Sequence, residues 1–156
     1  MAGTIVHLAV AENLFSYIKD NNLRYRFAES LDIDENYFIA GNICPDGIMA
    51  RKNYAREMKL HTHFRDGIPD GAFGNPGTVD LFEERMRDFW NVHLDDEKDC
   101  PGLYLGYITH MMTDEKFILK KRNEFFEAIS VTGLTDKNFT PLNFSTSFKS
   151  NVVALI

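Results

Sequence analysis

Apolar residues recur at helical spacing in the first part of the chain. Over residues 4–18 they form a stripe with intervals of three and four residues, made by Ile5, Leu8, Ala11, Phe15 and Ile18. A second stretch, residues 35–43, is apolar and contains small residues, which permits close packing against another helix. Asp32 or Asp34 is placed to cap it, because a short carboxylate can accept from the free N–H groups of a first turn. The pattern predicts two helices here.

Two further helices are predicted in the second half of the chain. Residues 78–92 have an apolar inner face, with Thr78 placed as the N-cap. The run from about 103 to 129 predicts the longest helix, with Pro101 at a first position where its missing N–H costs little. Glycine and proline between these segments predict a long irregular loop over about 47–78.

The pattern as a whole predicts an all-α fold, a single-domain helical bundle over residues 1–156 with a weakly patterned tail at 131–156. A hydrophobic content of 44% with 26% charged residues is typical of a globular protein. The net charge of −6 argues against a nucleic-acid partner. No run approaches the roughly 18 apolar residues of a transmembrane segment, and no signal peptide is recognised. A cytoplasmic location is therefore expected.

Several reactive or charged residues are predicted to lie outside any site. Cys44 and Cys100 belong to no cysteine or histidine cluster and are expected to be reduced. His93 is expected at the surface, and the acidic run 94–99 is expected to form a solvated loop.

The central helix contains His110 and Asp114, four residues apart and therefore on one face. Apolar residues surround the pair in the sequence. A buried imidazole and carboxylate must be hydrogen-bonded or must bind an ion. The spacing suits two ligands of one metal, and it equally suits an ordinary histidine–aspartate contact in the core.

Three other segments supply candidate ligands. His7 lies beside the apolar stripe of the first helix and faces inward or nearly so. Pro45 is expected to end the second helix and to place Asp46 on the following turn, as a ligand, a base or simply a turn-former. In the irregular loop, one of His61 and His63 is expected to bind a metal while the other is exposed or supports the ligands.

Taken in order, these motifs resemble the zinc-dependent phospholipase C family. Members have an early helix with a histidine, a helix ending in Gly-x-x-x-Pro-Asp, a Thr-His-Phe segment and a Leu-Gly-Tyr-x-x-His-x-x-x-Asp helix. This chain shows them as His7, residues 41–46, residues 62–64 and residues 105–114. The resemblance spans about residues 4–120, and the ordered conjunction is more specific than any one motif.

The resemblance implies an all-helical fold with the active site in a cleft at the core of the bundle. It also implies that one metal is bound by Asp46, His63, His110 and Asp114. Asp114 would bridge towards a second metal held partly by His7, and His61 is the reserve ligand if His63 points outward. The family's further site uses two histidines and a glutamate downstream. No histidine follows His110 here, so that site is absent or built differently.

The implied ligand set combines imidazole nitrogen with carboxylate oxygen, which suits Zn²⁺ and also Fe²⁺, Mn²⁺ or Co²⁺. One or two ions are expected. Zn²⁺ lowers the pKa of water to about 7 and so supplies a nucleophile near neutral pH. The sequence thus predicts a metal-dependent phosphoesterase that hydrolyses a small-molecule phosphodiester or phosphomonoester. Phospholipids are among the candidate substrates.

Within this hypothesis Asp46 both binds the metal and takes the proton of the attacking water. Cations in the predicted loop are candidates to receive the phosphate oxygens, although they also suit a solvated loop: Arg51, Lys52 and Arg65.

Two other classes of helical protein also combine histidine and aspartate. An HD-type phosphohydrolase needs an adjacent His-Asp pair, and no histidine of this chain is followed by aspartate, which argues against that class. A non-catalytic helical protein, in which four ligands close a structural metal site or support an interaction with a partner, stays open.

Overall fold

The computed structural model describes residues 3–20, 33–69 and 71–121. It contains five α-helices in this order: α1 Thr4–Asp20, α2 Glu35–Gly47, α3 Arg56–Thr62, α4 Pro76–His93 and α5 Leu103–Lys116. Three short helical segments accompany them: the 3₁₀ helices η1 Ile48–Ala50 and η2 Asp96–Lys98, and the π-helix η3 Phe117–Lys121. The described ranges contain no strand, so the all-α prediction is confirmed. The predicted extension of α5 beyond residue 121 and the tail 131–156 lie outside the described residues.

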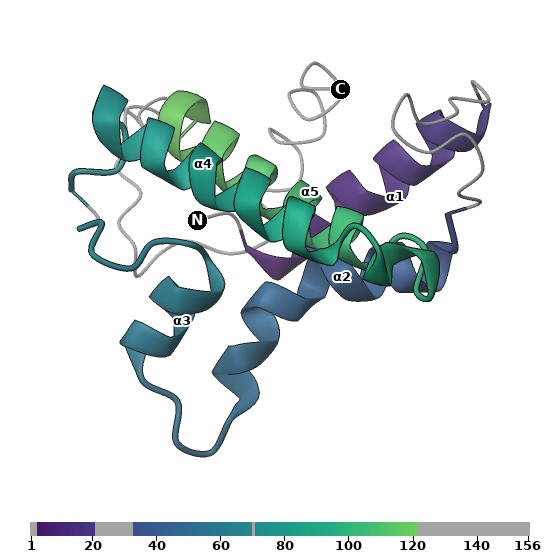
Figure 1. Cartoon of the computed structure of the whole chain (residues 1–156), viewed down its shortest axis with the longest axis horizontal. Coiled ribbons are helices and arrows are strands. Elements are labelled where there is room, and N and C mark those ends of the chain that lie inside the picture. The colour runs from purple at the N-terminus through teal and green to yellow at the C-terminus, as the bar shows by residue number, and fades with distance from the viewer. Residues whose placement is uncertain (1–2, 21–32, 70, 122–156) are drawn as a thin grey trace, which may run out of the picture.

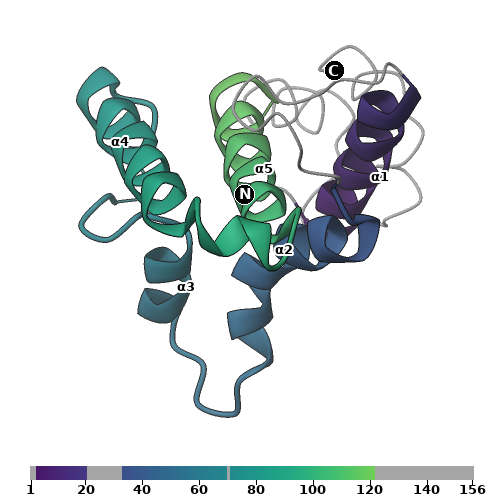
Figure 2. The same cartoon turned by 45° about the vertical axis from the view of Figure 1, so that its right-hand side comes forward.

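Helix α5 occupies the centre of the bundle and contacts α1, α2 and α4. Figure 2 shows α4, α5 and α1 next to one another, with α2 passing across the lower ends of α5 and α1. The short helix α3 lies below α4 and also packs against α2 (Figure 1). None of the described helices is long and apolar enough to cross a membrane.

The crossing of α2 and α5 depends on two glycines. A β-carbon added at Gly41 would lie 1.8 Å from the carbonyl oxygen of Leu103, and one added at Gly106 would lie 2.1 Å from that of Phe38. Both distances are impossible for a real side chain, so only glycine permits this approach. The prediction that small residues allow close packing of the second helix is thereby confirmed.

The starts of α2 and α4 differ in how well the sequence predicted them. Asp34 caps α2, because its Oδ1 accepts from two backbone N–H groups of the first turn at 2.8 and 3.2 Å. Thr78 is not the cap of α4, which begins two residues earlier at Pro76. Its hydroxyl instead donates to the carbonyls of Ala72 and Asn75, so Thr78 ties the preceding loop to the helix.

Helix α5 begins at Leu103 as predicted, but the residues just before it differ from the prediction in two respects. Pro101 lies outside the helix, and Gly102, with φ of 111°, is the N-cap. The acidic run 94–99 is not wholly solvated, since Glu97 is only 2% exposed. The Glu97 carboxylate accepts from the backbone N–H groups of Gly102 and Tyr104, both at 2.9 Å. These bonds satisfy donors that a helix start leaves free, which explains why an acidic residue is buried there.

Pro45 does not end α2, contrary to the sequence prediction, because the helix continues through Gly47 and places Asp46 in its last turn. A proline in the interior of a helix removes one backbone hydrogen bond. Near a C-terminus few bonds remain to be broken, and the carbonyl of Pro45 accepts from the Thr62 hydroxyl at 3.0 Å. Asp46 is thus held by a helix and not by a loop.

The loop predicted over 47–78 is interrupted by α3. The glycines and prolines used for that prediction all lie in residues 67–77, and none occurs in residues 48–66. This inner part consists largely of good helix formers such as Arg56, Glu57 and Leu60. Ile68 and Phe73 of the loop that follows α3 complete the apolar core. They pack with residues of α4, α5 and η3: Phe82, Met86, Met111 and Ile118.

Candidate metal centre

The five residues predicted as metal ligands meet in the interior of the bundle. His7 comes from α1, Asp46 from the last turn of α2, His63 from the residue that ends α3, and His110 and Asp114 from α5. Each of them is at most 6% exposed. Four chain segments therefore position polar side chains at one buried point.

The side chains approach one another closely around His63. Its Nε2 atom lies 3.2 Å from Nε2 of His110, 3.4 Å from Oδ1 of Asp46 and 3.8 Å from Oδ2 of Asp114. Ligand atoms of Asp46, His63 and His110 all lie within 4.8 Å of one another, a separation at which one ion can contact all three. The predicted i,i+4 pair on α5 is thus part of a larger cluster.

The tautomer of His110 follows from its backbone contact. Its Nδ1 lies 2.7 Å from the carbonyl oxygen of Asn42, which can only accept, so Nδ1 carries the proton and donates. Nε2 then presents a lone pair to the cluster. The close crossing at Gly41 and Gly106 brings the Asn42 carbonyl within reach of this ring.

The tautomer of His63 follows from the hydroxyl of Thr62. This hydroxyl lies 3.0 and 3.1 Å from the carbonyls of Pro45 and Lys59, and 3.1 Å from Nδ1 of His63. Its single proton is directed to a carbonyl, so its oxygen accepts from Nδ1 of the imidazole. This arrangement favours a proton on Nδ1 and a lone pair on Nε2 of His63.

Two lone pairs therefore face each other at 3.2 Å between His63 and His110, with two carboxylates beside them. Such an arrangement is repulsive, and a divalent cation among the four groups would compensate it. A proton on His110 does not provide that compensation at neutral pH, because burial and the neighbouring His7 lower the pKa of His110 to about 3. The residues present thus fit a metal ion.

His7 adds a second group of candidate ligands. Its ring stacks on that of His110 with centroids 3.6 Å apart, and its Nε2 lies 3.3 Å from Oδ1 of Asp114. Neither ring nitrogen makes a hydrogen bond to the described residues, although both are buried. Oδ1 of Asp114 faces His7 and Oδ2 faces His63, so this carboxylate presents one oxygen to each group of candidate ligands.

Asp46 is held at both of its oxygens. Oδ2 accepts from the hydroxyl of Thr4 at 3.3 Å, and Oδ1 lies 2.5 Å from the Lys59 ammonium. Burial alone would raise the pKa of Asp46, but the hydrogen bond and the positive charge of Lys59 lower it far below its usual value. Asp46 is therefore an anion at neutral pH.

Lys59 was not predicted as a site residue, although it contacts Asp46 and is only 8% exposed. It lies four residues before His63, so a helix places the two on the same face. That relation could be recognised only by predicting α3, and the sequence pattern had assigned this segment to an irregular loop.

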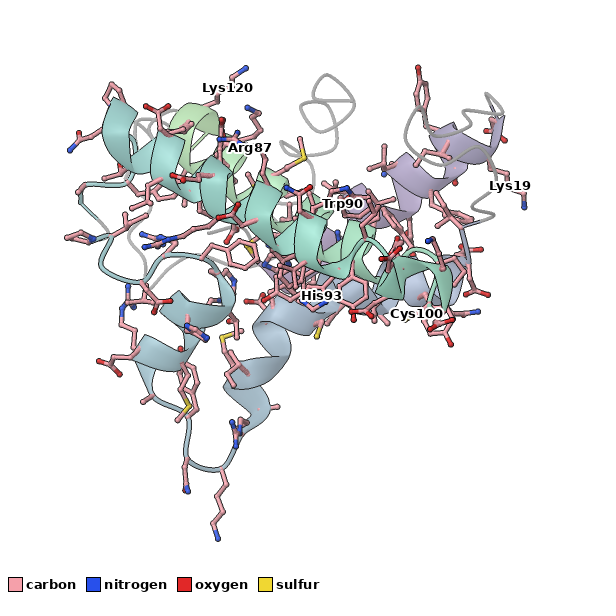
Figure 3. All side chains as sticks on the ribbon, in the orientation of Figure 1. Lys19, Arg87, Trp90, His93, Cys100 and Lys120 are labelled. Carbon is pink, nitrogen blue, oxygen red and sulfur yellow. The ribbon has the colours of Figure 1, made fainter. Side chains whose placement is uncertain are left out.

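Two other histidines lie outside the cluster. The side chain of His61 is 80% exposed and its Nδ1 lies 2.7 Å from Oδ2 of Asp66, so the reserve ligand points outward. His93 stands at the end of α4 (Figure 3), where its ring stacks on Tyr104 and Nδ1 lies 2.9 Å from Asp96. His93 is partly covered by this stacking but lies at the surface, as predicted.

The three cations predicted to bind phosphate are not gathered at one place. Arg51 and Lys52 are exposed in the connection between α2 and α3, which forms the lowest part of the molecule in Figure 1. Arg65 is buried, with its guanidinium 4.8 Å from the centre of the Phe73 ring. Lys59, by contrast, contacts a candidate ligand directly, through Oδ1 of Asp46.

Comparisons of the chain with protein-family models, with curated proteins and with solved structures find no match. The functional argument therefore depends on the geometry of the cluster and on the residues that form it.

Proposed function

We propose that this chain is a zinc-dependent phosphoesterase that hydrolyses a small-molecule phosphodiester or phosphomonoester, with phospholipids among the possible substrates. The observation that supports this proposal most is the convergence of two imidazole lone pairs and two buried carboxylates, from His63, His110, Asp46 and Asp114. A four-ligand set of nitrogen and oxygen donors suits Zn²⁺, with Fe²⁺ or Mn²⁺ as alternatives. The resemblance to zinc-dependent phospholipase C proposed from the sequence uses the same residues.

In this proposal the four residues hold one ion, and His7 with the second oxygen of Asp114 holds another. Bound zinc supplies a Lewis acid that lowers the pKa of water to about 7. The role of the chain is to fix the ligands: Asn42 orients His110 and Thr62 orients His63, each through Nδ1. Groups that orient metal ligands in this way commonly change metal affinity 10–100-fold.

Asp46 is the proposed base for the proton of the attacking water, in addition to its role as a ligand. An efficient base has a pKa near the working pH, whereas the contact with Lys59 keeps the pKa of Asp46 low. Movement of the ammonium to another anion would raise the pKa of Asp46 towards the working pH. A cytoplasmic location remains part of the proposal.

The test measures hydrolysis of bis(p-nitrophenyl) phosphate and p-nitrophenyl phosphate by the zinc-reconstituted protein and by Asp46→Asn. We expect zinc-dependent hydrolysis that falls by at least about 100-fold in the variant, the size of a general base contribution. Asp99→Asn, an exposed site away from the cluster, serves as the control.

Full activity of Asp46→Asn with zinc retained would refute the role given to Asp46. Stoichiometric zinc without hydrolysis of either ester would contradict the phosphoesterase proposal and favour the non-catalytic metal-binding alternative.

A further inference from the structure

The Lys59 ammonium is held inside the bundle by few groups. It contacts Oδ1 of Asp46, and its other described contact is the sulfur of Met49 at 3.5 Å. A thioether is a poor partner for a cation, so the carboxylate is the group that compensates the buried charge.

The same oxygen of Asp46 faces the candidate metal centre. Oδ1 lies 2.5 Å from the ammonium and 3.4 Å from Nε2 of His63. An ion bound by Asp46 and His63 therefore draws on the electron density that now stabilises Lys59. A buried ammonium is unfavourable when its anion is weakened, and a metal ion on Asp46 would share this carboxylate with Lys59, so a metal-loaded centre would favour a further anionic partner for Lys59.

We propose that Lys59 is a substrate-binding residue whose ammonium receives an oxygen of the phosphate group at the metal centre. This inference rests on the proposed function and names the cation that the phosphoesterase uses. An ammonium is a compact point charge well suited to phosphate.

Charge balance supports the same assignment. With one divalent ion, the two positive charges of the metal and the one of Lys59 face the negative charges of Asp46 and Asp114. One positive charge is left over, and a second ion at His7 would increase the excess. A buried excess of positive charge selects an anion, and a phosphodiester has a single negative charge to match it.

The position of Lys59 also suits this role better than that of the other cations in the segment. Thr62 ties α3 to both α2 and α5. Its hydroxyl donates to the carbonyl of Pro45 in α2, and its carbonyl accepts from the Tyr107 hydroxyl of α5 at 2.5 Å. Lys59 is therefore fixed relative to His63, whereas Arg51 and Lys52 lie in an exposed connection.

The test uses calorimetric titration of the full chain, first with zinc and then, on the zinc-loaded protein, with inorganic phosphate. Lys59→Met removes the charge at similar length, Lys59→Arg retains a charge, and Lys98→Met is the control, since Lys98 forms an exposed pair with Asp95. We expect Lys59→Met to bind zinc at least as tightly as the wild type, because a competitor for Asp46 is gone. Its phosphate affinity should fall about 10-fold or more, the value of a charge-assisted hydrogen bond.

Dimethyl phosphate and phosphatidylglycerol vesicles, titrated in the same way, separate a soluble phosphodiester from a lipid headgroup as the source of the anion. A loss of binding to either in Lys59→Met supports the inference and identifies that source. Lys59→Gln replaces Lys59→Met if the latter lacks the wild-type circular dichroism spectrum, with the same loss expected.

Failure of the two proposals can be told apart. No zinc binding by the wild type would overturn the proposed function itself. Normal zinc binding with equal phosphate affinity in the wild type and the neutral variants would overturn only the role of Lys59. Zinc binding without any phosphate binding by the wild type would also overturn that role.

Discussion

At the residue scale, the candidate metal centre depends on which nitrogen of each histidine carries the proton. Asn42 and Thr62 contact Nδ1 of His110 and His63, respectively, and so direct both Nε2 lone pairs to the same point. One of these contacts comes from a backbone carbonyl, which no substitution removes. The other comes from a hydroxyl and can be tested.

Thr62→Val removes the hydroxyl that favours the Nδ1–H tautomer of His63. We expect zinc affinity to fall about 10–100-fold, the usual effect of removing a group that orients a metal ligand. Competition with a fluorescent zinc chelator measures the affinity.

Thr78→Val is the matched control, because its hydroxyl bonds the carbonyls of Ala72 and Asn75 in another part of the bundle. This control is expected to lose stability without losing zinc affinity. Equal zinc affinities of Thr62→Val and the wild type would show that the hydroxyl does not set the tautomer.

The residues that hold the centre could be predicted from the sequence to different extents. His110 and Asp114 were recognisable because helical spacing places them on one face. Asp46 and His63 depended on the ordered motifs. Lys59 and Asn42 escaped prediction, since one acts from a helix that the pattern did not reveal and the other through a backbone atom that has no sequence signature.

At the scale of helices, the crossing of α2 and α5 positions most of the centre. Gly106→Ala would place a β-carbon 2.1 Å from the Phe38 carbonyl and 2.8 Å from the backbone nitrogen of Asn42. Alanine favours a helix over glycine by about 1 kcal/mol, but overpacking typically costs about 1–3 kcal/mol. We expect a net loss of stability, measured by urea unfolding, together with weaker zinc binding.

Gly77→Ala is the control for this substitution, since a β-carbon at Gly77 in α4 meets nothing within 4 Å. It is expected to leave stability unchanged or to raise it by up to about 1 kcal/mol. If Gly106→Ala were as stable as Gly77→Ala, the close crossing of α2 and α5 would be wrong.

The beginning of α5 provides a second test at this scale. Glu97→Ala removes the carboxylate that accepts from Gly102 and Tyr104, and loss of a helix cap costs about 0.5–2 kcal/mol. Thermal unfolding compared with that of Asp99→Asn, an exposed neighbour, measures the effect. A melting temperature of Glu97→Ala equal to that of this control would mean that the cap contributes nothing to stability.

Local pattern predicted where helices lie better than it predicted where they end. The apolar periodicity located α1, α2, α4 and α5, because each must bury one face. In α1 the predicted stripe was partly wrong, since Ile5 is 75% exposed and Val6 and His7 are buried instead. Pro45 and the acidic run misled the prediction, since both are accommodated by long-range contacts: Thr62 bonds the Pro45 carbonyl, and Glu97 bonds the start of α5. Contacts between distant segments cannot be seen in a local pattern.

At the scale of the whole molecule, the candidate ligands join α1, α2, α5 and the end of α3. An ion that binds the folded chain and not the unfolded one stabilises it, by about 2.7 kcal/mol at a free concentration 100 times Kd. For a chain of this size, each kcal/mol raises Tm by about 2–4 °C. Zinc is therefore expected to raise Tm by roughly 5–10 °C, and chelation should reverse the shift.

Differential scanning fluorimetry with and without zinc measures this shift, and His110→Ala provides the comparison. The variant should show little response to zinc. A shift of the same size in His110→Ala would indicate that zinc stabilises the chain from somewhere other than the proposed centre.

The central claim is that the buried cluster binds a metal ion. Elemental analysis tests it most directly, on protein purified without chelator and without a nickel column, in parallel with His110→Ala and Asp114→Asn. The account predicts at least one equivalent of zinc or iron in the wild type and its loss from both variants while their helical circular dichroism spectra are retained. A wild-type protein that binds no metal even after reconstitution would contradict it.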